Sequence, residues 1–335
     1  MYKYISLFLC FFVVACSAPT PPLVSFYYWK THFSLTKTEQ NALETLKVKK
    51  LYVKFFDIDW DAERQQAVPL ASVSFDSLSL GKQAIVPTIF ITNRTFLNTT
   101  PTQIEELAQK TSRRIEQLSP TSYQEIQIDC DWTAQTKVSF FSFLILLKKI
   151  NPTQKISCTV RLHQVKEVVQ MGIPPCDQGV LMLYNTGELE NSQETNSIFN
   201  AGLAKNYLVH LPDYPLKLDF ALAIFQWGVV QRDGKTIKLI HALSEKTLDN
   251  THFLRKDATH FEVAQSTYLD GYYLYAGDKI RLEQANPSDL TSIATFIAQN
   301  AREQPYSILF YHLDEKNILN YSVPFLEKLT GTGIE

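Results

Sequence analysis

The sequence predicts an α/β protein, a (β/α)8 barrel of the TIM type with a β-containing insertion between its seventh and eighth strands. Eight apolar, strand-like runs alternate with amphipathic helical runs, and this number favours a closed barrel over an open doubly wound sheet. The strand runs are almost continuously apolar, as expected for parallel strands that helices cover. With 335 residues, 45% of them hydrophobic, the chain can bury the large core that this fold needs.

Strand-like and helix-like segments follow one another in a regular order. The predicted strands cover residues 23–29, 50–59, 84–92, 125–132, 155–163, 179–185, 218–230 and 306–314. Apolar residues at helical spacing predict helices at 36–50, 101–118, 138–150, 196–208, 287–302 and 323–331. The link at 62–83 is weakly helical and is the least regular unit of the pattern.

The pattern breaks between the seventh and eighth strands, at about residues 231–284. Asp233-Gly234 is a hairpin signal, and a second strand pair is expected to turn at Gly277 and Asp278. The insertion also carries Tyr268, Tyr272, Tyr273 and Tyr275. As a loop that follows a barrel strand, it is expected at the functional rim, either as a lid or cleft wall or as a subdomain that buries its own tyrosines.

The N-terminus has the pattern of an export signal. Lys3 precedes an apolar run at 5–15 that is too short to span a bilayer, and Val13, Val14, Ala15 and Cys16 resemble the lipobox of bacterial lipoproteins. This predicts a signal peptide at 1–15, a lipidated tether at 16–23 beginning with Cys16, and a barrel domain at 24–335. The implied location is the cell envelope, anchored in the outer membrane and facing the periplasm. The alternative is an ordinary secretory signal with a chance cysteine.

Charge and cysteine content exclude several classes of function. Lys+Arg 32 against Asp+Glu 34 gives a net charge of -2, so no global field favours nucleic acid. After processing, an odd set of thiols remains, Cys130, Cys158 and Cys176, without zinc-ligand spacing. Buried free thiols are expected, with a Cys130–Cys158 disulfide as the minority alternative.

Polar side chains end nearly every predicted strand, where a barrel places its functional site. They are Tyr28 and Trp29, Asp57 and Asp59, Thr92 and Asn93, Asp129 and Asp131, Arg161 and His163, Tyr184 and Asn185, Gln226 and Trp227, and His312 and Asp314. Alternation directs Asp129 and Asp131 into the barrel mouth and turns Cys130 and Trp132 toward the helices. Asp131 and Arg161 lie on neighbouring strands, so they are expected to pair; the alternative is a charge network that only satisfies itself.

These groups predict carbohydrate chemistry at the mouth. Two close carboxylates cannot both ionise cheaply, which is one way to make the general acid of a glycoside hydrolase. In the hydrolytic version Asp131 is the acid, held by Arg161 or His163, and Asp129 or Asp57 is the second carboxylate. The expected ligand-binding residues are Asp59, Trp29, Arg161, His163, Tyr184, Asn185 and Trp227, whose aromatic members suit a sugar face.

No cofactor and no metal site are predicted. The stretch DIDWDAE begins like a calcium loop, but Ala62 replaces the required glycine and Val68 replaces the bidentate glutamate. A single oxygen-ligated ion among Asp57, Asp59 and Asp129 is the minority alternative.

The fourth strand, IQIDCDWT at 126–133, resembles the D-G-x-D-x-D-W-E signature of the chitinase-like glycoside hydrolases, which are (β/α)8 barrels that cleave N-acetylglucosamine polymers. Asp129, Asp131 and Trp132 match, whereas Thr133 stands where that family has its proton-donating glutamate. The resemblance covers this strand alone and does not carry chitinase activity with it.

A second resemblance covers most of the mature chain. Stretches such as YVKFFDIDWD, VPTIFITN and GIPPCDQGVLMLYNTG resemble a family of lipoproteins of Bacteroidetes-type bacteria with a glycoside-hydrolase-like barrel. It implies fold and location rather than chemistry. The prediction is a lipid-anchored barrel that binds a carbohydrate or related polyhydroxylated ligand and, in one version, hydrolyses it. The alternative is a non-catalytic glycan-binding or envelope-assembly lipoprotein; no protein partner is indicated.

Overall fold

The computed structural model describes residues 21–76, 81–191, 194–301 and 305–331. The predicted signal peptide, Cys16 and most of the predicted tether lie outside these residues. No helix within the described ranges is both long enough and apolar enough to cross a bilayer.

Eight parallel strands close into a barrel, which confirms the predicted fold class. They are β1 (Leu23–Tyr28), β3 (Lys50–Asp61), β6 (Ala84–Ile91), β7 (Glu125–Asp129), β8 (Lys155–Arg161), β9 (Gln178–Leu183), β10 (Leu218–Ala223) and β18 (Ser307–Tyr311). Each pairs with its neighbours in chain order, and β1 pairs with both β18 and β3, so the sheet has no open edge within the barrel.

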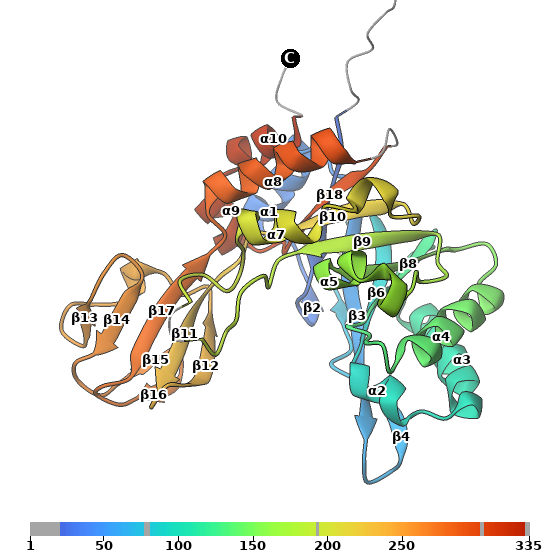
Figure 1. Ribbon diagram of the computed structural model, residues 1–335, viewed down its shortest axis with the longest axis horizontal. Helices are drawn as coiled ribbons and strands as arrows, with labels where there is room; N and C mark the ends of the chain where they lie inside the picture. Colours follow the sequence, from blue (N-terminus) through green and yellow to red (C-terminus); the bar gives the residue numbers. More distant parts are fainter. Residues whose placement is uncertain (1–20, 77–80, 192–193, 302–304, 332–335) are drawn as a thin grey trace, which may run out of the picture.

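Helices cover the outside of the barrel (Figure 1). They are α1 (Lys37–Thr45), α2 (Asn93–Asn98), α3 (Pro101–Leu118), α4 (Lys137–Ile150), α5 (Leu162–Lys166), α6 (Val168–Met171), α7 (Ala201–Tyr207), α8 (Pro287–Asn300), α9 (Glu315–Tyr321) and α10 (Val323–Thr330). Capping boxes begin two of them, with Thr36 and Glu39 at α1 and Thr100 and Gln103 at α3. Local sequence therefore sets where these helices start.

The described parts of the link between the second and third barrel strands, residues 62–76 and 81–83, contain no helix, so the prediction of a weakly helical link is wrong there. β4 (Gln66–Leu70) folds back antiparallel on the end of β3, and β5 (Ser74–Phe75) pairs with β2 (His32–Phe33). β4 is an edge strand, and edge strands are where sheets tolerate a proline such as Pro69.

The insertion forms a five-stranded antiparallel sheet with its own apolar core. Its strands are β11 (Gln226–Arg232), β12 (Lys235–His241), β13 (Phe253–Arg255), β14 (His260–Val263) and β17 (Lys279–Gln284), and β15 (Thr267–Leu269) pairs separately with β16 (Tyr272–Leu274). Figure 1 shows the insertion and the β3–β4 hairpin projecting from the same end of the barrel. The hairpin predicted at Asp233-Gly234 joins β11 to β12.

Three details of the insertion differ from expectation. The predicted seventh strand is two strands, because β10 ends at Ala223 and β11, which starts at Gln226, belongs to the second sheet. Both strands are buried, so the apolar run shows no break. β16 and β17 do not pair with each other across Gly277; β16 turns back to β15 at Asp270-Gly271. Of the two alternatives for the insertion tyrosines, burial in the insertion's own core does not hold for Tyr268, Tyr273 and Tyr275, which are exposed.

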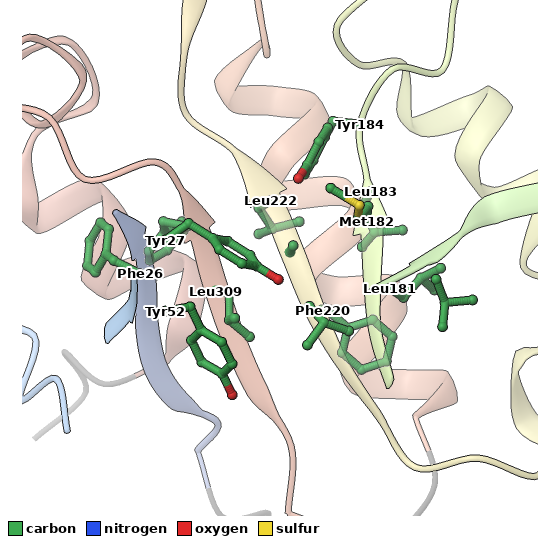
Figure 2. Packing of buried hydrophobic residues seen from close by; sticks show 14 of the residues in the cluster. Phe26, Tyr27, Tyr52, Leu181, Met182, Leu183, Tyr184, Phe220, Leu222 and Leu309 are labelled. Atoms are coloured by element: carbon green, nitrogen blue, oxygen red, sulfur yellow. The ribbon is translucent and has the colours of Figure 1, made fainter. Parts of the chain in front are cut away.

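Large side chains fill the barrel interior and the layer beneath the helices. Figure 2 shows Tyr27, Tyr52 and Tyr184 among the buried side chains of the core. In the outer layer Trp132 is fully buried and stacks on Phe140 of α4, with ring centroids 5.1 Å apart. Cys130 is buried as well, as alternation predicts.

The three thiols of the described chain are free, so the Cys130–Cys158 disulfide does not form. The Sγ of Cys158 lies 3.5 Å from that of Cys176, which approaches it from the loop before β9.

Candidate functional site

Asp129 ends β7 inside the barrel and is only 6% exposed. Its Oδ1 accepts a hydrogen bond of 2.7 Å from the Thr159 hydroxyl on β8. Burial, together with the nearby negative charge of Asp131, raises the pKa of Asp129 to about 6. Asp129 therefore exchanges a proton close to neutral pH.

Asp131 and Arg161 form the pair that the sequence predicts. Arg161 donates to both carboxylate oxygens through Nε and Nη2, and the Nη2 to Oδ2 distance is 2.7 Å. The Arg161 side chain is 20% exposed and that of Asp131 is 47% exposed, so the pair lies at the open end of the barrel. A two-pronged, charge-assisted hydrogen bond of this kind holds the two side chains in one geometry.

Asp57 is paired by a residue of its own strand. The Lys54 Nζ lies 3.1 Å from Asp57 Oδ2, and Lys54 is only 11% exposed. A register shift in β3 after Lys54 permits this contact at a spacing of three residues. The second oxygen, Asp57 Oδ1, is buried and has no hydrogen-bond partner among the described residues.

Asp59 belongs to a different set of contacts. Arg94 in α2 donates to both of its oxygens, and the Thr92 hydroxyl donates to Oδ1 at 2.7 Å. These hydrogen bonds, with Arg94 the largest contributor, hold the pKa of Asp59 well below its usual range. Asp59 thus fastens the start of α2 to the β3–β4 hairpin.

Aromatic rings line the interior next to the carboxylates. Tyr184 stacks on Tyr311 with ring centroids 5.3 Å apart, and Trp29 meets Tyr311 edge-on at 5.5 Å. The Tyr184 hydroxyl is buried, and no described side chain or backbone group pairs with it, whereas the buried Tyr27 hydroxyl has Gln127 as a neighbour. Burial raises the pKa of both tyrosines, so they remain neutral.

Three predicted site residues lie elsewhere than alternation suggests. His163 is in the first turn of α5 and exposed, because β8 ends at Arg161 and strand alternation stops there. Asn185 is exposed with a positive φ of 56°, and its backbone N–H donates to Ile198 O. Trp227 is on β11 in the insertion, where its Nε1 donates to Glu283 Oε2 at 2.7 Å.

Two residues of this site were not singled out from the sequence. Lys54 is visible as a cation inside an apolar strand, but only the register shift shows that it reaches Asp57. Tyr311 lies one residue before the polar strand end at His312, and its contacts with Trp29 and Tyr184 depend on barrel closure.

Thr133 is exposed at the position where the chitinase-like signature has glutamate. Its backbone N–H donates to the Thr136 hydroxyl at 2.9 Å, and its carbonyl accepts from Thr136 and Lys137 as α4 begins. No carboxylate can replace the glutamate from this residue.

No group of three or more His, Cys, Asp or Glu side chains in the described ranges is arranged to hold a metal ion. Asp57 and Asp59 are bound to Lys54 and Arg94 respectively.

Comparison with solved structures shows that the chain shares its fold with chitinase-type barrels. The putative chitinase C-terminal domain of Desulfitobacterium hafniense DCB-2 superposes with a TM-score of 0.62 at 11% identity, covering 93% of this chain and 100% of that one. The spore cortex-lytic enzyme SleL of Bacillus megaterium QM B1551 has a TM-score of 0.57 at 11% identity, covering 91% and 75%. An Ostrinia furnacalis Group II chitinase domain in complex with a chitooligosaccharide has a TM-score of 0.54 at 10% identity, covering 93% and 97%.

Comparison with protein-family models and with curated sequences found no match. The resemblance to Bacteroidetes-type lipoproteins therefore stays a prediction, and at these identities the structural likeness establishes the (β/α)8 fold alone.

Proposed function

We propose that the barrel mouth binds a glycan containing N-acetylhexosamine units and does not cleave it by the chitinase mechanism. The observation that carries the proposal is a pair of buried polar atoms at the mouth, Asp57 Oδ1 and the Tyr184 hydroxyl, that the described chain leaves unpaired. Buried polar groups of this kind cost free energy unless a partner supplies the hydrogen bond. A polyhydroxylated ligand supplies such partners, and Trp29 and Tyr311 offer it aromatic faces.

The choice of glycan rests on the neighbours. They include chitinases and a spore cortex-lytic enzyme, and one of the chitinase domains was solved with a chitooligosaccharide. The shared fold and the Asp129, Asp131 and Trp132 match support an amino-sugar polymer over other polyhydroxylated ligands.

The absence of cleavage follows from the carboxylates. Thr133 offers no acid, and both carboxyl oxygens of Asp131 accept hydrogen bonds from Arg161. The pKa of Asp129 is raised to about 6, but its carboxyl group is buried and bonded to Thr159. None of these three presents an exposed proton to a glycosidic oxygen, which general acid catalysis requires.

Hydrolysis remains the second candidate because of one observation, the pKa of Asp129 of about 6. In that version Asp129, rather than Asp131, donates the proton after ligand-induced rearrangement, with Asp131 or Asp57 as the second carboxylate.

The test is calorimetric titration with chitooligosaccharides and soluble peptidoglycan fragments, combined with chromatography of the same mixtures. We expect binding without new products. Tyr184→Phe removes one unpaired hydroxyl at the mouth and should weaken binding about threefold or more. Tyr214→Phe is the matched control, because its hydroxyl is also buried and unpaired but lies outside the mouth.

Absence of binding to every glycan would overturn the proposal as a whole. Release of products would overturn its non-hydrolytic part, and Asp129→Asn, which keeps an acceptor for Thr159, would then show whether Asp129 is the acid.

We also propose that lipid on Cys16 anchors the protein in the outer membrane with the mouth directed away from the bilayer. The lipobox-like sequence supports the anchor. The tether joins β1 at Leu23, which pairs with Ser307 at the start of β18, the end of the barrel opposite the mouth. Cys16→Ser should move the protein from the membrane fraction to the soluble fraction and abolish metabolic labelling with palmitate; retention in membranes would contradict the anchor.

A further inference from the structure

Two of the three free thiols lie side by side on the outer side of the barrel wall. Cys158 is part of β8, and its Sγ lies 3.5 Å from the Sγ of Cys176, which comes just before β9. Alternation along β8 directs Cys158 outward, because the hydroxyls of its neighbours Ser157 and Thr159 donate to carboxylates inside the barrel. The two sulfurs therefore meet outside the barrel interior and apart from the mouth.

Hydrogen bonds hold the segment that carries Cys176 against β8. The backbone N–H of Asp177 donates to the Ile156 carbonyl at 2.8 Å, and the Asp177 carboxylate accepts from the Ile156 N–H at 2.7 Å. Immediately afterwards, Gly179 lies opposite Cys158 in the register of β8 and β9. Because these backbone contacts fix both segments, the closeness of the two sulfurs is a property of the fold.

The third thiol, Cys130, is not placed for bonding to Cys158. It follows the end of β7, where Ile128 lies opposite Cys158, so Cys130 is displaced by two residues along the neighbouring strand. At about 3.3 Å per residue and about 4.8 Å between strands, the Cα atoms of Cys130 and Cys158 are about 8 Å apart. Disulfides rarely join Cα atoms more than about 7 Å apart, so Cys176 is the better partner of Cys158.

The two adjacent thiols differ in their access to solvent. Cys158 is fully buried, whereas Cys176 is partly exposed. Burial also raises the pKa of the Cys158 thiol, which keeps it protonated. Since a thiolate is the attacking form of cysteine, an oxidant from solution reacts with Cys176 first.

We propose that Cys158 and Cys176 form a disulfide by exchange with an external disulfide, while Cys130 stays reduced. The Cys176 sulfur first attacks the external disulfide, which gives a mixed disulfide and one external thiolate that takes up the Cys176 proton. The Cys158 sulfur then attacks the Cys176 sulfur, and the second external thiolate leaves and takes up the Cys158 proton. The protein thereby loses two electrons, and the external disulfide is reduced to two thiols.

The disulfide joins β8 to the segment that leads into β9. Its formation brings the sulfurs from 3.5 Å to about 2 Å, a shift of about 1.5 Å between two side chains. A cross-link of this kind restricts the unfolded chain, so it stabilises the folded protein. The pair lies outside the barrel mouth, so the proposal does not depend on glycan binding.

Peptide mapping of the full chain tests the proposal, because trypsin places these three cysteines in separate peptides, 115–137, 156–161 and 167–205. The native protein is incubated with oxidised glutathione, its remaining thiols are blocked with N-ethylmaleimide in denaturant, and the digest is analysed by mass spectrometry. We expect peptide 156–161 to be linked to peptide 167–205, and peptide 115–137 to carry N-ethylmaleimide. After reduction with dithiothreitol, all three peptides should carry N-ethylmaleimide.

The cysteine variants should give different products with oxidised glutathione. Cys158→Ala should stop at the mixed disulfide, with glutathione on Cys176, and Cys176→Ser should leave the buried Cys158 unreacted. Cys130→Ala is the matched control, since Cys130 is also a buried thiol, and it should form the same link as the wild type. Oxidation should raise the thermal midpoint by about 5 °C in the wild type and in Cys130→Ala, but not in Cys176→Ser.

Oxidised wild-type protein in which peptides 156–161 and 167–205 are not linked would overturn the proposal. So would a link from peptide 115–137 to either of them. The mapping of the wild type needs no variant to fold, and glycan titration of the oxidised and reduced samples reports separately on the mouth.

Discussion

The two ends of the barrel interior treat buried charge in opposite ways. At the base, Glu125 accepts hydrogen bonds from Lys50 at 2.8 Å, Tyr52 at 3.2 Å and Ser157 at 2.7 Å, and the Asp219 Oδ1 accepts from the Ser307 N–H at 2.6 Å. At the mouth, by contrast, Asp57 Oδ1 and the Tyr184 hydroxyl have no partner in the described chain.

This difference separates stability from function. Polar groups that satisfy one another hold the strands together, whereas unpaired groups reduce stability and are retained where a ligand completes them. The base should therefore respond to substitution in its free energy of unfolding, and the mouth should respond in ligand binding.

The largest expected effect is at the base. Glu125→Ala leaves Lys50, Tyr52 and Ser157 without their acceptor and opens a cavity, so the free energy of unfolding should fall by about 3 kcal/mol. Denaturant unfolding measures this, and glycan affinity of the folded fraction should not change. If Glu125→Ala lost glycan affinity but no stability, the base would not be the stabilising end of the barrel, and the distinction between base and mouth would be wrong.

The next prediction concerns one buried acid at each end of the barrel, Asp219 at the base and Asp129 at the mouth. Burial raises the pKa of Asp219 to about 6, and burial with Asp131 does the same for Asp129. Because the folded protein binds these protons more tightly than the unfolded chain, each acid favours folding below pH 4 and loses this contribution as the pH rises through 6. Asp219→Asn and Asp129→Asn should each raise the free energy of unfolding at pH 8, on the order of 2 kcal/mol, and change it little at pH 4.

Glycan then distinguishes the two acids. Bound ligand should alter the pH dependence of stability in the wild type and in Asp219→Asn, but much less in Asp129→Asn. Equal ligand effects in both variants would mean that Asp129 does not sense the ligand.

A smaller effect is expected from the pair at the mouth. Arg161→Lys removes the two-pronged hydrogen bond to Asp131 while keeping the charge. Because the pair is partly exposed, the loss of stability should be about 1 kcal/mol, whereas glycan affinity should fall about tenfold. Arg232→Lys is the matched control, since Arg232 holds Asp278 in the insertion by two hydrogen bonds of 2.7 and 2.8 Å. Equal loss of affinity in both variants would count against a specific role for Arg161.

The smallest effect should come from Asp59. Asp59→Asn weakens a contact with Arg94, whose side chain is 63% exposed. Exposed ion pairs contribute little, so the thermal midpoint should fall by less than about 3 °C and glycan affinity should stay within twofold. A large loss of affinity would place Asp59 in the ligand site, as the strand-end pattern suggested.

Much of this comparison was predictable from alternation. The apolar runs predict all eight barrel strands, and two-residue periodicity predicts that Asp129 and Asp131 face inward while Trp132 faces α4. The prediction was wrong where a strand ends and no change in the pattern of apolar and polar residues marks its end. β10 and β11 form one apolar run, and His163 follows a strand that has already ended.

The sequence by itself determined the strand count, the inward acids, the partner of Asp131 and the threonine at position 133, because these depend on local periodicity and residue identity. Only the tertiary structure decided that Lys54 reaches Asp57 across a register shift and that Cys158 lies beside Cys176. These features arise from contacts whose geometry is set by barrel closure and backbone irregularity, which no local pattern encodes.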